Sequence, residues 1–498
     1  MNLKELLDGI ERVSTHGPLD KEITALTVDS RTVAEGTLFA AIRGEKADGH
    51  DFIDTAREKG AAAIMAERDV PEHYRETWLR VPDSRKAIGE AADTYYGRPS
   101  DELLVCGITG TNGKTTTAFL LHHLLTEATG RCGLIGTVKY DTGLGPEASS
   151  HTTPDWIAVQ RLLSEMRSNG CRGVAMEVSS HALQQSRVHG IRFDAGVFTN
   201  LTQDHLDYHG SMEEYFLAKA GLFEHMTLQG GPKKPAAIIN SEDAWGRRLS
   251  QMFEGKLNIV KFGMGMTADF RATDVRTGMQ GTQFTLEARG RTFLVRLPLI
   301  GRFNIYNALG AIATSWAIGL NLRETITNIA RAPQVPGRMQ SVAEGKPFRV
   351  FVDYAHTPDA LENALRTLKD LGPRKLITVF GCGGDRDRTK RPKMGAVSES
   401  LSSYSIITSD NPRSEDPEKI LAEIRTGMRG DHVESIMDRK SAITKAIGLA
   451  GSGDIVLIAG KGHEQGQTFA TKTLPFDDVR VAQSVLREWT IPDRGERR

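Results

Sequence analysis

A glycine-rich segment near position 110 contains the residues whose types and spacing most clearly indicate a chemical role. Gly107–Thr117 reads GITGTNGKTTT and follows the apolar stretch LLVCGIT. Glycines after a strand let backbone N–H groups curl around phosphate oxygens, and the N-terminus of the next helix adds a favourable field. Lys114 would reach the β- and γ-phosphates, and the Thr115 hydroxyl would sit on Mg²⁺. The run therefore predicts an ATP site made of Gly110, Thr111, Asn112, Gly113, Lys114, Thr115 and Thr116.

The spacing departs from the generic phosphate-loop pattern GxxxxGK[ST], because Ile108 stands where the first glycine would be. A glycine-rich turn with an incidental Gly-Lys-Thr is the alternative. The strand before the run, the helical stretch Thr115–Thr129 after it and the three threonines favour the nucleotide site.

The elements that position this run indicate an α/β protein with three domains. At about 150 residues per domain, 498 residues predict three domains. Residues 1–97 end in the turn-like segment YYGRPSDE, residues 98–333 contain the glycine-rich run, and residues 334–498 form a third block. Strand and helix patterns alternate in each block, which is typical of parallel sheets with crossover helices. The expected strands are Leu26–Val28, Thr37–Ile42, Ala62–Met65, LLVCGIT, Gly173–Glu177, Ala195–Thr199, FRVFVDY, KLITVFG, YSIITSD and DIVLIAG.

Composition excludes some classes of protein. Lys plus Arg and Asp plus Glu are 63 each, so the formal charge is zero and no nucleic-acid partner is expected. No apolar run is long enough for a membrane span, and MNLKELLDGIERV resembles an amphipathic helix more than a signal peptide. The four cysteines are widely spaced and predict buried thiols in a reducing cytoplasm.

The variant TGTNGKTTT, with MEVSSH at 176–181 and TNLTQDHLDYHG at 199–210, resembles the ATP-dependent Mur ligases and their folylpolyglutamate synthase relatives. These enzymes join a carboxylate to an amine through an acyl phosphate. The resemblance implies an N-terminal α/β domain that binds a uridine nucleotide, a central phosphate-loop domain with a parallel sheet, and a C-terminal Rossmann-like α/β domain. It also implies a monomer that uses ATP and Mg²⁺.

Metal and phosphate chemistry are further implications of the resemblance. Glu177 and Thr115 match ligands of one magnesium ion, and His205 matches a residue that helps to bind a second magnesium ion. Lys219 matches a lysine that is carbamylated (N6-carboxylysine). Asn304 borders the adenine, Arg338 offers a guanidinium to the γ-phosphate, and Asp353 accepts hydrogen bonds from the ribose. The implied catalytic set is Lys114, Lys219, His205, Arg338 and His356. The general base stays open, with His356 and the carbamate as candidates.

Within the family, the nearest pattern is that of ligases that add the third residue of the peptidoglycan stem peptide. The implied contacts with the substrate UDP-MurNAc-L-Ala-D-Glu are Ser30, Glu45, Lys46, Ala47, Thr152, Thr153, Ser179, Gln185 and Arg187. The implied contacts with the incoming amino acid are Arg386, Asp410, Asn411, Pro412, Arg413, Gly460 and Glu464.

The motif Asp-Asn-Pro-Arg at 410–413 indicates which amino acid is added. Ligases of the family that use meso-diaminopimelate carry this motif, whereas those that use L-lysine generally lack its arginine. Diaminopimelate differs from lysine by a distal carboxylate, which the guanidinium of Arg413 can bind in a bidentate fashion. The same guanidinium leaves the bare ammonium of lysine facing a like charge. A lysine-adding ligase, a folylpolyglutamate synthase and a phosphate-loop ATPase without ligase activity remain the alternatives.

Overall fold

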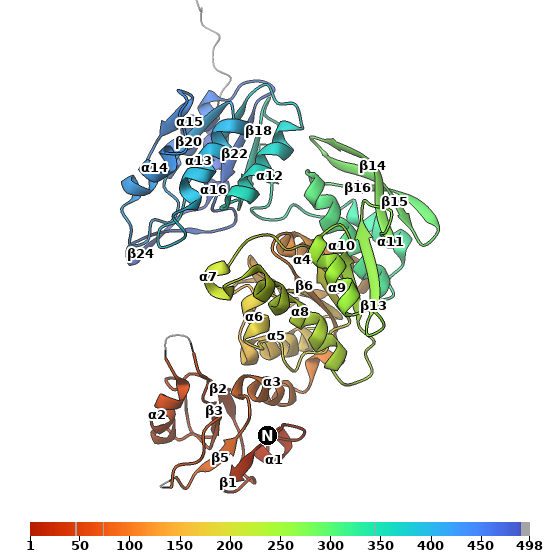
Figure 1. The fold of residues 1–498 in the computed structure, drawn as a ribbon, viewed down its shortest axis with the longest axis vertical. Coiled ribbons are helices and arrows are strands. Elements are labelled where there is room, and N and C mark those ends of the chain that lie inside the picture. The colour runs from red at the N-terminus through yellow and green to blue at the C-terminus, as the bar shows by residue number, and fades with distance from the viewer. Residues whose placement is uncertain (45–46, 73, 344, 490–498) are drawn as a thin grey trace, which may run out of the picture. The chain divides into compact units, whose positions relative to one another are not determined.

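The computed structural model describes residues 1–44, 47–72, 74–343 and 345–489 (Figure 1). The chain forms two compact units. One comprises Met1–Thr273, Leu286–Phe293 and Tyr306–Ile329, and the other comprises Asp274–Thr285, Leu294–Ile305 and Ala330–Arg498. Sheets of five, eleven and six strands and one two-stranded ribbon make up the β-structure of the described residues.

The first sheet lies in residues 1–97 and has the order β1-β5-β4-β3-β2. Strands β2 to β5 are parallel, and β1 runs antiparallel to β5. Its elements are α1 (Leu3–Leu6), β1 (Ser14–His16), β2 (Ala25–Thr27), β3 (Thr37–Ala40), α2 (Ile53–Glu58), β4 (Ala63–Ala66), β5 (Thr77–Arg80) and α3 (Ser84–Tyr95).

The second sheet has the order β16-β15-β14-β13-β12-β11-β6-β10-β7-β8-β9, so β6 lies at its centre between β11 and β10. The strands from β13 to β7 in this order are parallel. Its strands are β6 (Leu104–Thr109), β7 (Cys132–Ile135), β8 (Lys139–Asp141), β9 (Pro146–Ala148), β10 (Gly173–Glu177), β11 (Ala195–Phe198), β12 (Ala236–Asn240), β13 (Asn258–Gly263), β14 (Phe270–Gly278), β15 (Gly281–Ala288) and β16 (Arg291–Leu297). Its helices are α4 (Lys114–Thr129), α5 (Trp156–Ser168), α6 (Ser180–Gln184), α7 (Leu206–His209), α8 (Met212–Leu228), α9 (Ala244–Met252), α10 (Arg302–Ala317) and α11 (Leu322–Ile329).

The third sheet has the order β17-β18-β22-β19-β20-β21, and all its strands except β17 are parallel. Its strands and the separate ribbon are β17 (Gln340–Ser341), β18 (Arg349–Asp353), β19 (Leu376–Phe380), β20 (Tyr404–Ile407), β21 (Val433–Ser435), β22 (Ile455–Ala459), β23 (Gly466–Phe469) and β24 (Lys472–Pro475). The helices are α12 (Pro358–Lys369), α13 (Lys390–Leu401), α14 (Pro417–Arg425), α15 (Arg439–Leu449) and α16 (Asp478–Glu488).

The alternation of apolar side chains along the third sheet explains its two helical layers. Phe351 and Leu457 pack in one core with residues of α12, α13 and α14. Their neighbours Val350, Val352 and Val456 pack in a second core with α15 and α16. Because successive strand residues point to opposite faces, near-continuous apolar strands require helices on both sides.

The fold class predicted from the sequence is confirmed, and all the expected strands are present with shifts of at most three residues at their ends. The expected N-terminal helix over residues 1–13 is wrong beyond its first turn, because α1 ends at Leu6 and Gly9 has a positive φ of 80°. No helix in the described part of the chain is both long and apolar enough to cross a membrane. All four cysteines are buried thiols, as predicted.

Candidate active site

The glycine-rich run connects β6 to α4 and depends on two glycines. Gly110 has φ 143°, and a Cβ on it would lie 1.9 Å from the Thr199 hydroxyl oxygen. Gly113 has φ 87°, and a Cβ there would lie 2.3 Å from Asn307 Oδ1. Both backbone conformations favour glycine, and both positions lack space for a side chain. The loop is therefore packed closely at the carboxyl end of the central strand, where ligands of parallel sheets bind.

The segment that follows β11 holds the tip of this loop. The backbone N–H groups of Thr111 and Asn112 donate to the main-chain oxygen and the Oδ1 of Asn200, both at 2.9 Å. The Thr199 hydroxyl donates to the main-chain oxygen of Asn112 at 2.6 Å. The Thr111 hydroxyl lies 3.2 Å from the hydroxyl of Tyr215 on α8. These bonds fix the loop against two neighbouring elements of the same unit.

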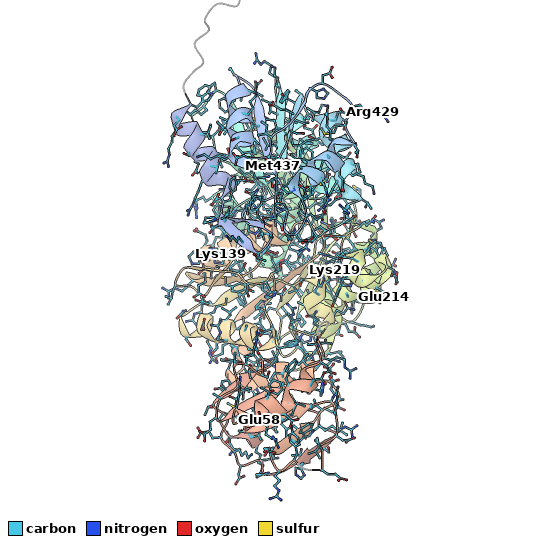
Figure 2. The ribbon with its side chains drawn as sticks, turned by 90° about the vertical axis from the view of Figure 1, so that its left-hand side faces the viewer. Glu58, Lys139, Glu214, Lys219, Arg429 and Met437 are labelled. Atoms are coloured by element: carbon cyan, nitrogen blue, oxygen red, sulfur yellow. The ribbon has the colours of Figure 1, made fainter. Side chains whose placement is uncertain are left out.

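Two lysines converge on one carbonyl oxygen of the loop. Lys114 and Lys219 each donate from Nζ to the main-chain oxygen of Gly110 at 2.9 Å. Lys219 is buried on α8, with Nζ 4.4 Å from the centroid of the Tyr215 ring (Figure 2). Burial, with a contribution from the charge of Lys114, holds the pKa of Lys219 well below its usual value. Burial therefore favours the neutral amine form of Lys219 more than it would in an exposed lysine.

Glu177 ends β10 next to the start of α4, and its surroundings are suited to a hard cation. The side chain is buried, and the Thr115 hydroxyl donates to Glu177 Oε2 at 3.1 Å. Thr137 donates to the carboxylate from its backbone N–H at 2.9 Å and from its hydroxyl at 3.0 Å. Hydroxyl and carboxylate oxygens are the donors that Mg²⁺ prefers. The pair Thr115 and Glu177 therefore fits the predicted metal.

The other two predicted metal ligands do not join this pair directly. His205 is half-exposed, has a left-handed backbone with φ 52° and lies 3.5 Å from Asp204 across Nε2 and Oδ2. Its pKa is lowered by desolvation and by the charges of Lys114 and Lys219. Among the described residues, no three His, Cys, Asp or Glu side chains form a ready metal site. Lys219 in its amine form is a hydrogen-bond donor, so it could contribute ligand oxygens only after carbamylation.

The residues predicted to hold the muramoyl dipeptide lie in one hydrogen-bonded cluster beside Glu177. Thr153 donates from its hydroxyl to the main-chain oxygen of Glu177 at 2.8 Å and accepts from the backbone N–H of Ser179 at 3.0 Å. The hydroxyls of Thr152 and Thr137 are 3.0 Å apart. Thr152 is thus linked to the Glu177 carboxylate through Thr137, and Thr153 is bonded to the backbone of Glu177.

Arg187 completes this cluster. Its guanidinium donates to the main-chain oxygen of Thr153 at 2.9 Å and to Gln185 Oε1 at 2.7 and 2.9 Å. Gln185 in turn donates to the Tyr208 hydroxyl at 3.3 Å. The fold thus brings together the five predicted dipeptide contacts of this unit, which are separated by up to 35 positions in the sequence. The guanidinium of Arg187 gives the cluster a positive charge that suits an acidic substrate.

The predicted uridine-nucleotide contacts in the first sheet are described only in part. Ser30 follows β2 and is buried, and Lys59 Nζ donates to its main-chain oxygen at 3.1 Å. Ala47 follows β3 and is exposed. Because β2 and β3 are parallel neighbours, these two residues follow the same edge of the sheet. Glu45 and Lys46 lie outside the described residues.

In the second unit, the predicted ribose and γ-phosphate residues meet at the end of β18. Asp353 accepts hydrogen bonds from the backbone N–H groups of Met339 at 2.7 Å and Ala355 at 2.9 Å. Desolvation raises the pKa of its carboxyl, and the charge of Arg338 opposes this shift. The guanidinium of Arg338 lies 4.6 Å from the centroid of the Tyr354 ring. This arrangement holds the predicted carboxylate and guanidinium within one short segment of the fold.

Two further predicted residues of this unit have local partners. Asn304 is buried on α10, and its Nδ2 donates to the main-chain oxygen of Ile300 at 2.8 Å. His356 is exposed, and its Nδ1 lies 2.9 Å from the main-chain oxygen of Tyr354. A proton on Nδ1 would make that contact a hydrogen bond and leave Nε2 able to accept a proton.

The predicted amino-acid contacts gather where β19, β20 and β22 end. Gly460 has φ 116°, and a Cβ there would lie 2.6 Å from Asp410 Oδ2, which has no hydrogen-bond partner among the described residues. Gly384 approaches so closely that a Cβ would lie 1.8 Å from the main-chain oxygen of Pro412. Asn411 Nδ2 donates to Glu464 Oε2 at 2.8 Å.

Arg413 holds its position through its backbone and its side chain. It has a left-handed φ of 52°, and its backbone N–H donates to Thr468 at 3.0 Å. Its Nη1 donates to the main-chain oxygen of Gly384 at 2.7 Å. Arg386 is exposed on the neighbouring loop, and its Nη1 donates to the main-chain oxygen of Asp385 at 3.0 Å. The structure therefore brings Arg413, Arg386 and Glu464 to one edge of the third sheet.

Sequence reasoning missed three residues that organise these clusters. Asn200 and Thr137 bind the phosphate loop and Glu177 but have no distinctive spacing of their own. Lys461 is fully buried and donates to both Asn411 and Glu464. Its place in the segment GKGHE, between two residues predicted as contacts, is the signal that could have found it.

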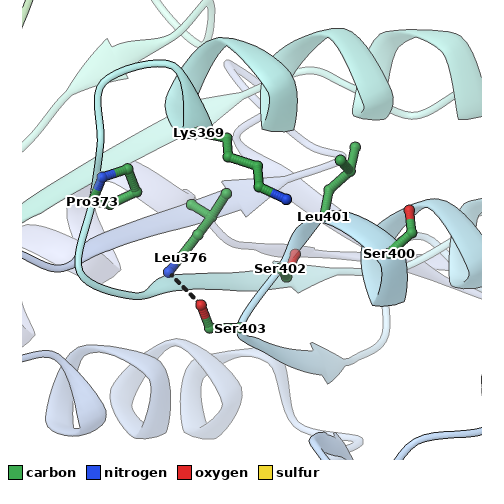
Figure 3. Close-up of a pocket in the computed structure, with 7 residues that line it drawn as sticks. All are labelled: Lys369, Pro373, Leu376, Ser400, Leu401, Ser402 and Ser403. Carbon is green, nitrogen blue, oxygen red and sulfur yellow. Dashed lines mark hydrogen bonds between the residues drawn. The ribbon is translucent and has the colours of Figure 1, made fainter.

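Two surface hollows lie away from the predicted residues. A cavity of about 170 Å³ is lined by the ends of α12 and α13 and the start of β19, where Leu376 N donates to Ser403 Oγ at 3.1 Å (Figure 3). It lies at the amino end of β19, opposite the edge where parallel sheets bind ligands. A larger hollow of about 560 Å³ lies beside α9 and β13. The predicted site residues line neither hollow.

Known proteins similar to this chain match nearly all of it. Family models described as Mur ligase family, catalytic domain, Mur ligase middle domain, and Mur ligase, glutamate ligase domain match residues 22–96, 108–315 and 337–462. A relative from Solibacter usitatus, named UDP-N-acetylmuramoyl-L-alanyl-D-glutamate--2,6-diaminopimelate ligase, is 44% identical over 491 residues, which cover 98% of each chain.

Solved structures agree with this match. A structure of a UDP-N-acetylmuramoyl-L-alanyl-D-glutamate--2,6-diaminopimelate ligase has a TM-score of 0.73 at 33% identity and covers 98% of this chain and 99% of its own. The MurF ligase from Thermotoga maritima, solved in complex with ADP, has a TM-score of 0.62 at 20% identity, with coverage of 93% and 98%, and shares the fold. The chain belongs to the Mur ligase family.

Proposed function

We propose that this chain is an ATP-dependent ligase that adds meso-diaminopimelate to UDP-N-acetylmuramoyl-L-alanyl-D-glutamate in peptidoglycan precursor synthesis. ATP is consumed and ADP and phosphate are released. Residues 1–97 bind the uridine nucleotide, residues 98–333 bind ATP, and residues 334–498 bind the incoming amino acid. The reaction takes place in the cytoplasm, and the acting species is a monomer.

The first step transfers the γ-phosphoryl group of ATP to the substrate. The γ-carboxylate of D-glutamate attacks the γ-phosphorus, the bond to the β,γ-bridging oxygen breaks, and ADP leaves an acyl phosphate behind. The phosphate loop from Gly110 to Thr116 cradles the nucleotide, and Lys114 and Arg338 neutralise the charge on the transferred group. Asp353 binds the ribose, and Asn304 borders the adenine.

Thr115 and Glu177 hold Mg²⁺, which neutralises phosphate charge when it is bound. His205 and carbamylated Lys219 complete the predicted metal-binding set. The carbamate forms when the neutral amine attacks CO₂, making an N–C bond and releasing one proton to solvent. This chemistry needs an unprotonated lysine, and the lowered pKa of Lys219 favours that form. The fit of Thr115 and Glu177 to a hard cation supports the metal.

The second step forms the amide bond. The unprotonated amine of diaminopimelate attacks the acyl carbonyl, a tetrahedral intermediate forms, and its collapse expels phosphate. Ser179, Gln185, Arg187, Thr152 and Thr153 hold the acceptor dipeptide. Arg413 and Arg386 face carboxylates of diaminopimelate, and Glu464 faces the ammonium of its distal centre. Asp410, Asn411, Pro412 and Gly460 shape the same edge.

One observation carries this proposal beyond an ATPase. The third sheet presents guanidinium groups and a carboxylate together at its ligand-binding edge, with Arg413 locked by its own backbone. A zwitterionic amino acid with a second carboxylate is the ligand that this charge pattern suits. ATP hydrolysis without an amine substrate does not require Arg413, Arg386 and Glu464 to lie together at this edge.

The test is phosphate release by the purified chain with ATP, Mg²⁺ and UDP-MurNAc-L-Ala-D-Glu. Meso-diaminopimelate, L-lysine and no amine are compared. We expect release only with diaminopimelate, and loss of the preference over lysine in Arg413→Ala. Release with lysine alone would favour a lysine-adding ligase, and release that ignores the amine would leave an ATPase.

A further inference from the structure

Lys461 is a buried cation at the centre of the predicted amino-acid subsite. Its side chain is fully buried, and Nζ donates to Asn411 Oδ1 at 2.9 Å and to Glu464 Oε2 at 3.0 Å. Asn411 Nδ2 donates to the same Glu464 oxygen at 2.8 Å, and the backbone N–H of Thr468 donates to Asn411 Oδ1 at 3.0 Å. The three side chains thus form a closed triangle of hydrogen bonds.

The triangle uses one oxygen of the Glu464 carboxylate, Oε2, and does not use the other, Oε1. Both internal bonds go to Oε2, and Oε1 accepts none from the described part of the chain. The Glu464 side chain is 31% exposed, so Oε1 can meet a ligand without breaking the triangle. A carboxylate held in this way offers a fixed acceptor to an ammonium group.

The triangle also joins two segments that carry opposite charges. Asn411 lies two residues before Arg413, and Glu464 lies on the loop after β22. Without Lys461, only one side-chain hydrogen bond would link these segments through Glu464. Lys461 therefore helps to set the distance between Arg413 and the carboxylate of Glu464.

We propose that Lys461 is a positioning residue that fixes Glu464 to receive the distal ammonium of the incoming amino acid. The inference rests on the proposed function, because it takes Glu464 as a ligand of diaminopimelate. It adds a determinant for the distal ammonium, whereas Arg413 accounts only for the distal carboxylate. Lys461 acts through Glu464 and does not touch the substrate itself.

Two physical effects of removing Lys461 oppose each other. Loss of its positive charge would by itself strengthen the attraction of Glu464 for an ammonium. Loss of its hydrogen bond would free the carboxylate to turn away, which costs the fixed geometry of a charge-assisted contact. We expect geometry to dominate, because the screened attraction at a partly exposed carboxylate is weak.

The experiment compares two amine substrates with the full chain and its Lys461→Met variant. Meso-diaminopimelate has the distal ammonium, whereas 2-aminopimelate keeps both carboxylates and the reacting amine but lacks that ammonium. The readout is the ratio of kcat/KM for the two substrates. We expect Lys461→Met to raise the KM for diaminopimelate and to reduce the ratio about tenfold, while the KM for ATP stays within about twofold.

Lys233→Met is the matched control, because Lys233 is a largely buried lysine whose side chain is 9% exposed, with Nζ 2.5 Å from Asp194 Oδ2, far along the chain from this subsite. It should leave the ratio unchanged even if stability falls. An unchanged or increased ratio in Lys461→Met would overturn the inference. If that variant does not fold, Lys461→Gln is measured with the same two outcomes. A wild-type chain that uses neither amine would instead contradict the proposed function.

Discussion

At the scale of single residues, the chemistry beside the phosphate loop depends on a lysine, Lys219, whose pKa the fold lowers. Lys114 and Lys219 donate to the same carbonyl oxygen, which brings two lysine amino groups together beside the loop. Desolvation and the neighbouring charge both disfavour protonation of Lys219. A lysine with an ordinary pKa is mostly protonated at neutral pH, and only its small neutral fraction reacts with CO₂.

The first prediction concerns this amine. Carbamate formation consumes the neutral form and releases a proton, so it should increase with pH and with bicarbonate concentration. With ¹³C-labelled bicarbonate at about pH 8, we expect one carbamate carbon signal that weakens as the pH falls, because protonation of the lowered-pKa amine reverses the reaction. Lys219→Ala should lack the signal and lose about 100-fold or more in kcat.

A carbamate signal that persists in Lys219→Ala would assign the modification to another lysine. Addition of a short carboxylic acid to Lys219→Ala gives a second readout. If the carbamate supplies oxygens to the metal, a free carboxylate should restore part of the activity. No restoration, with the variant folded, would contradict that role.

The second prediction concerns Glu177. Glu177→Gln keeps the shape of the side chain but removes the charge that faces the metal, so the Mg²⁺ concentration for half-maximal activity should rise about tenfold or more. A titration of activity with Mg²⁺ after chelation measures this shift. Glu165→Gln on α5 is the control, because Glu165 is partly exposed and its ion pair within the described residues is with Arg161. Equal Mg²⁺ curves for wild type and Glu177→Gln would remove Glu177 from the metal site.

At the scale of elements, the parallel sheets place chemistry at their carboxyl ends. The glycine-rich run follows β6, Glu177 ends β10 and Thr199 follows β11, and these three strands are neighbours. Asp353, Asp410 and Gly460 follow the same rule in the third sheet. The apolar strand patterns in the sequence therefore predicted that the polar residues that follow them lie together at the carboxyl ends of the sheets.

Other features could not be predicted from sequence patterns. The strands β14 and β16 and the ribbon β23–β24 carry mixed polar and apolar residues without a clear alternation. β15 does alternate, with Phe284 and Leu286 buried between more exposed residues, but it was not among the expected strands. The triangle around Lys461 depends on contacts between residues 50 positions apart, which no local pattern encodes. Glu177 and His205 were predicted to bind two different magnesium ions, and no local sequence pattern encodes how these two positions are arranged.

The third prediction belongs to the loop after β6. Gly110→Ala adds a Cβ 1.9 Å from the Thr199 hydroxyl at a φ of 143°, so the loop must shift. Gly130→Ala at the end of α4 has φ 88° but open space around it, so only backbone strain of about 1–2 kcal/mol is expected there. Chemical denaturation should show the larger loss of unfolding free energy for Gly110→Ala. ATP binding, measured by calorimetry, should be lost only in that variant.

If Gly110→Ala bound ATP normally, the close approach of the loop to Thr199 would have no role in nucleotide binding. If both variants lost the same stability, backbone strain alone would account for the cost. The comparison of the two variants therefore distinguishes the effect of close packing against Thr199 from the effect of backbone conformation.

At the scale of the whole molecule, the family match covers three stretches of the chain that together carry all the predicted clusters except the end of the GKGHE segment. The dipeptide cluster and the metal pair lie in the first unit, and the amino-acid cluster lies in the second. A ligase requires the amino-acid cluster of the second unit, whereas an ATPase would not require it.

The most direct test of the central claim is product analysis by mass spectrometry alongside ADP measurement. With ATP, Mg²⁺, UDP-MurNAc-L-Ala-D-Glu and meso-diaminopimelate, we predict the UDP-MurNAc-tripeptide with equal amounts of product and ADP. The product should be absent when either the amine or the dipeptide nucleotide is omitted. ADP formation without any tripeptide, from a folded chain supplied with all four components, would contradict the account.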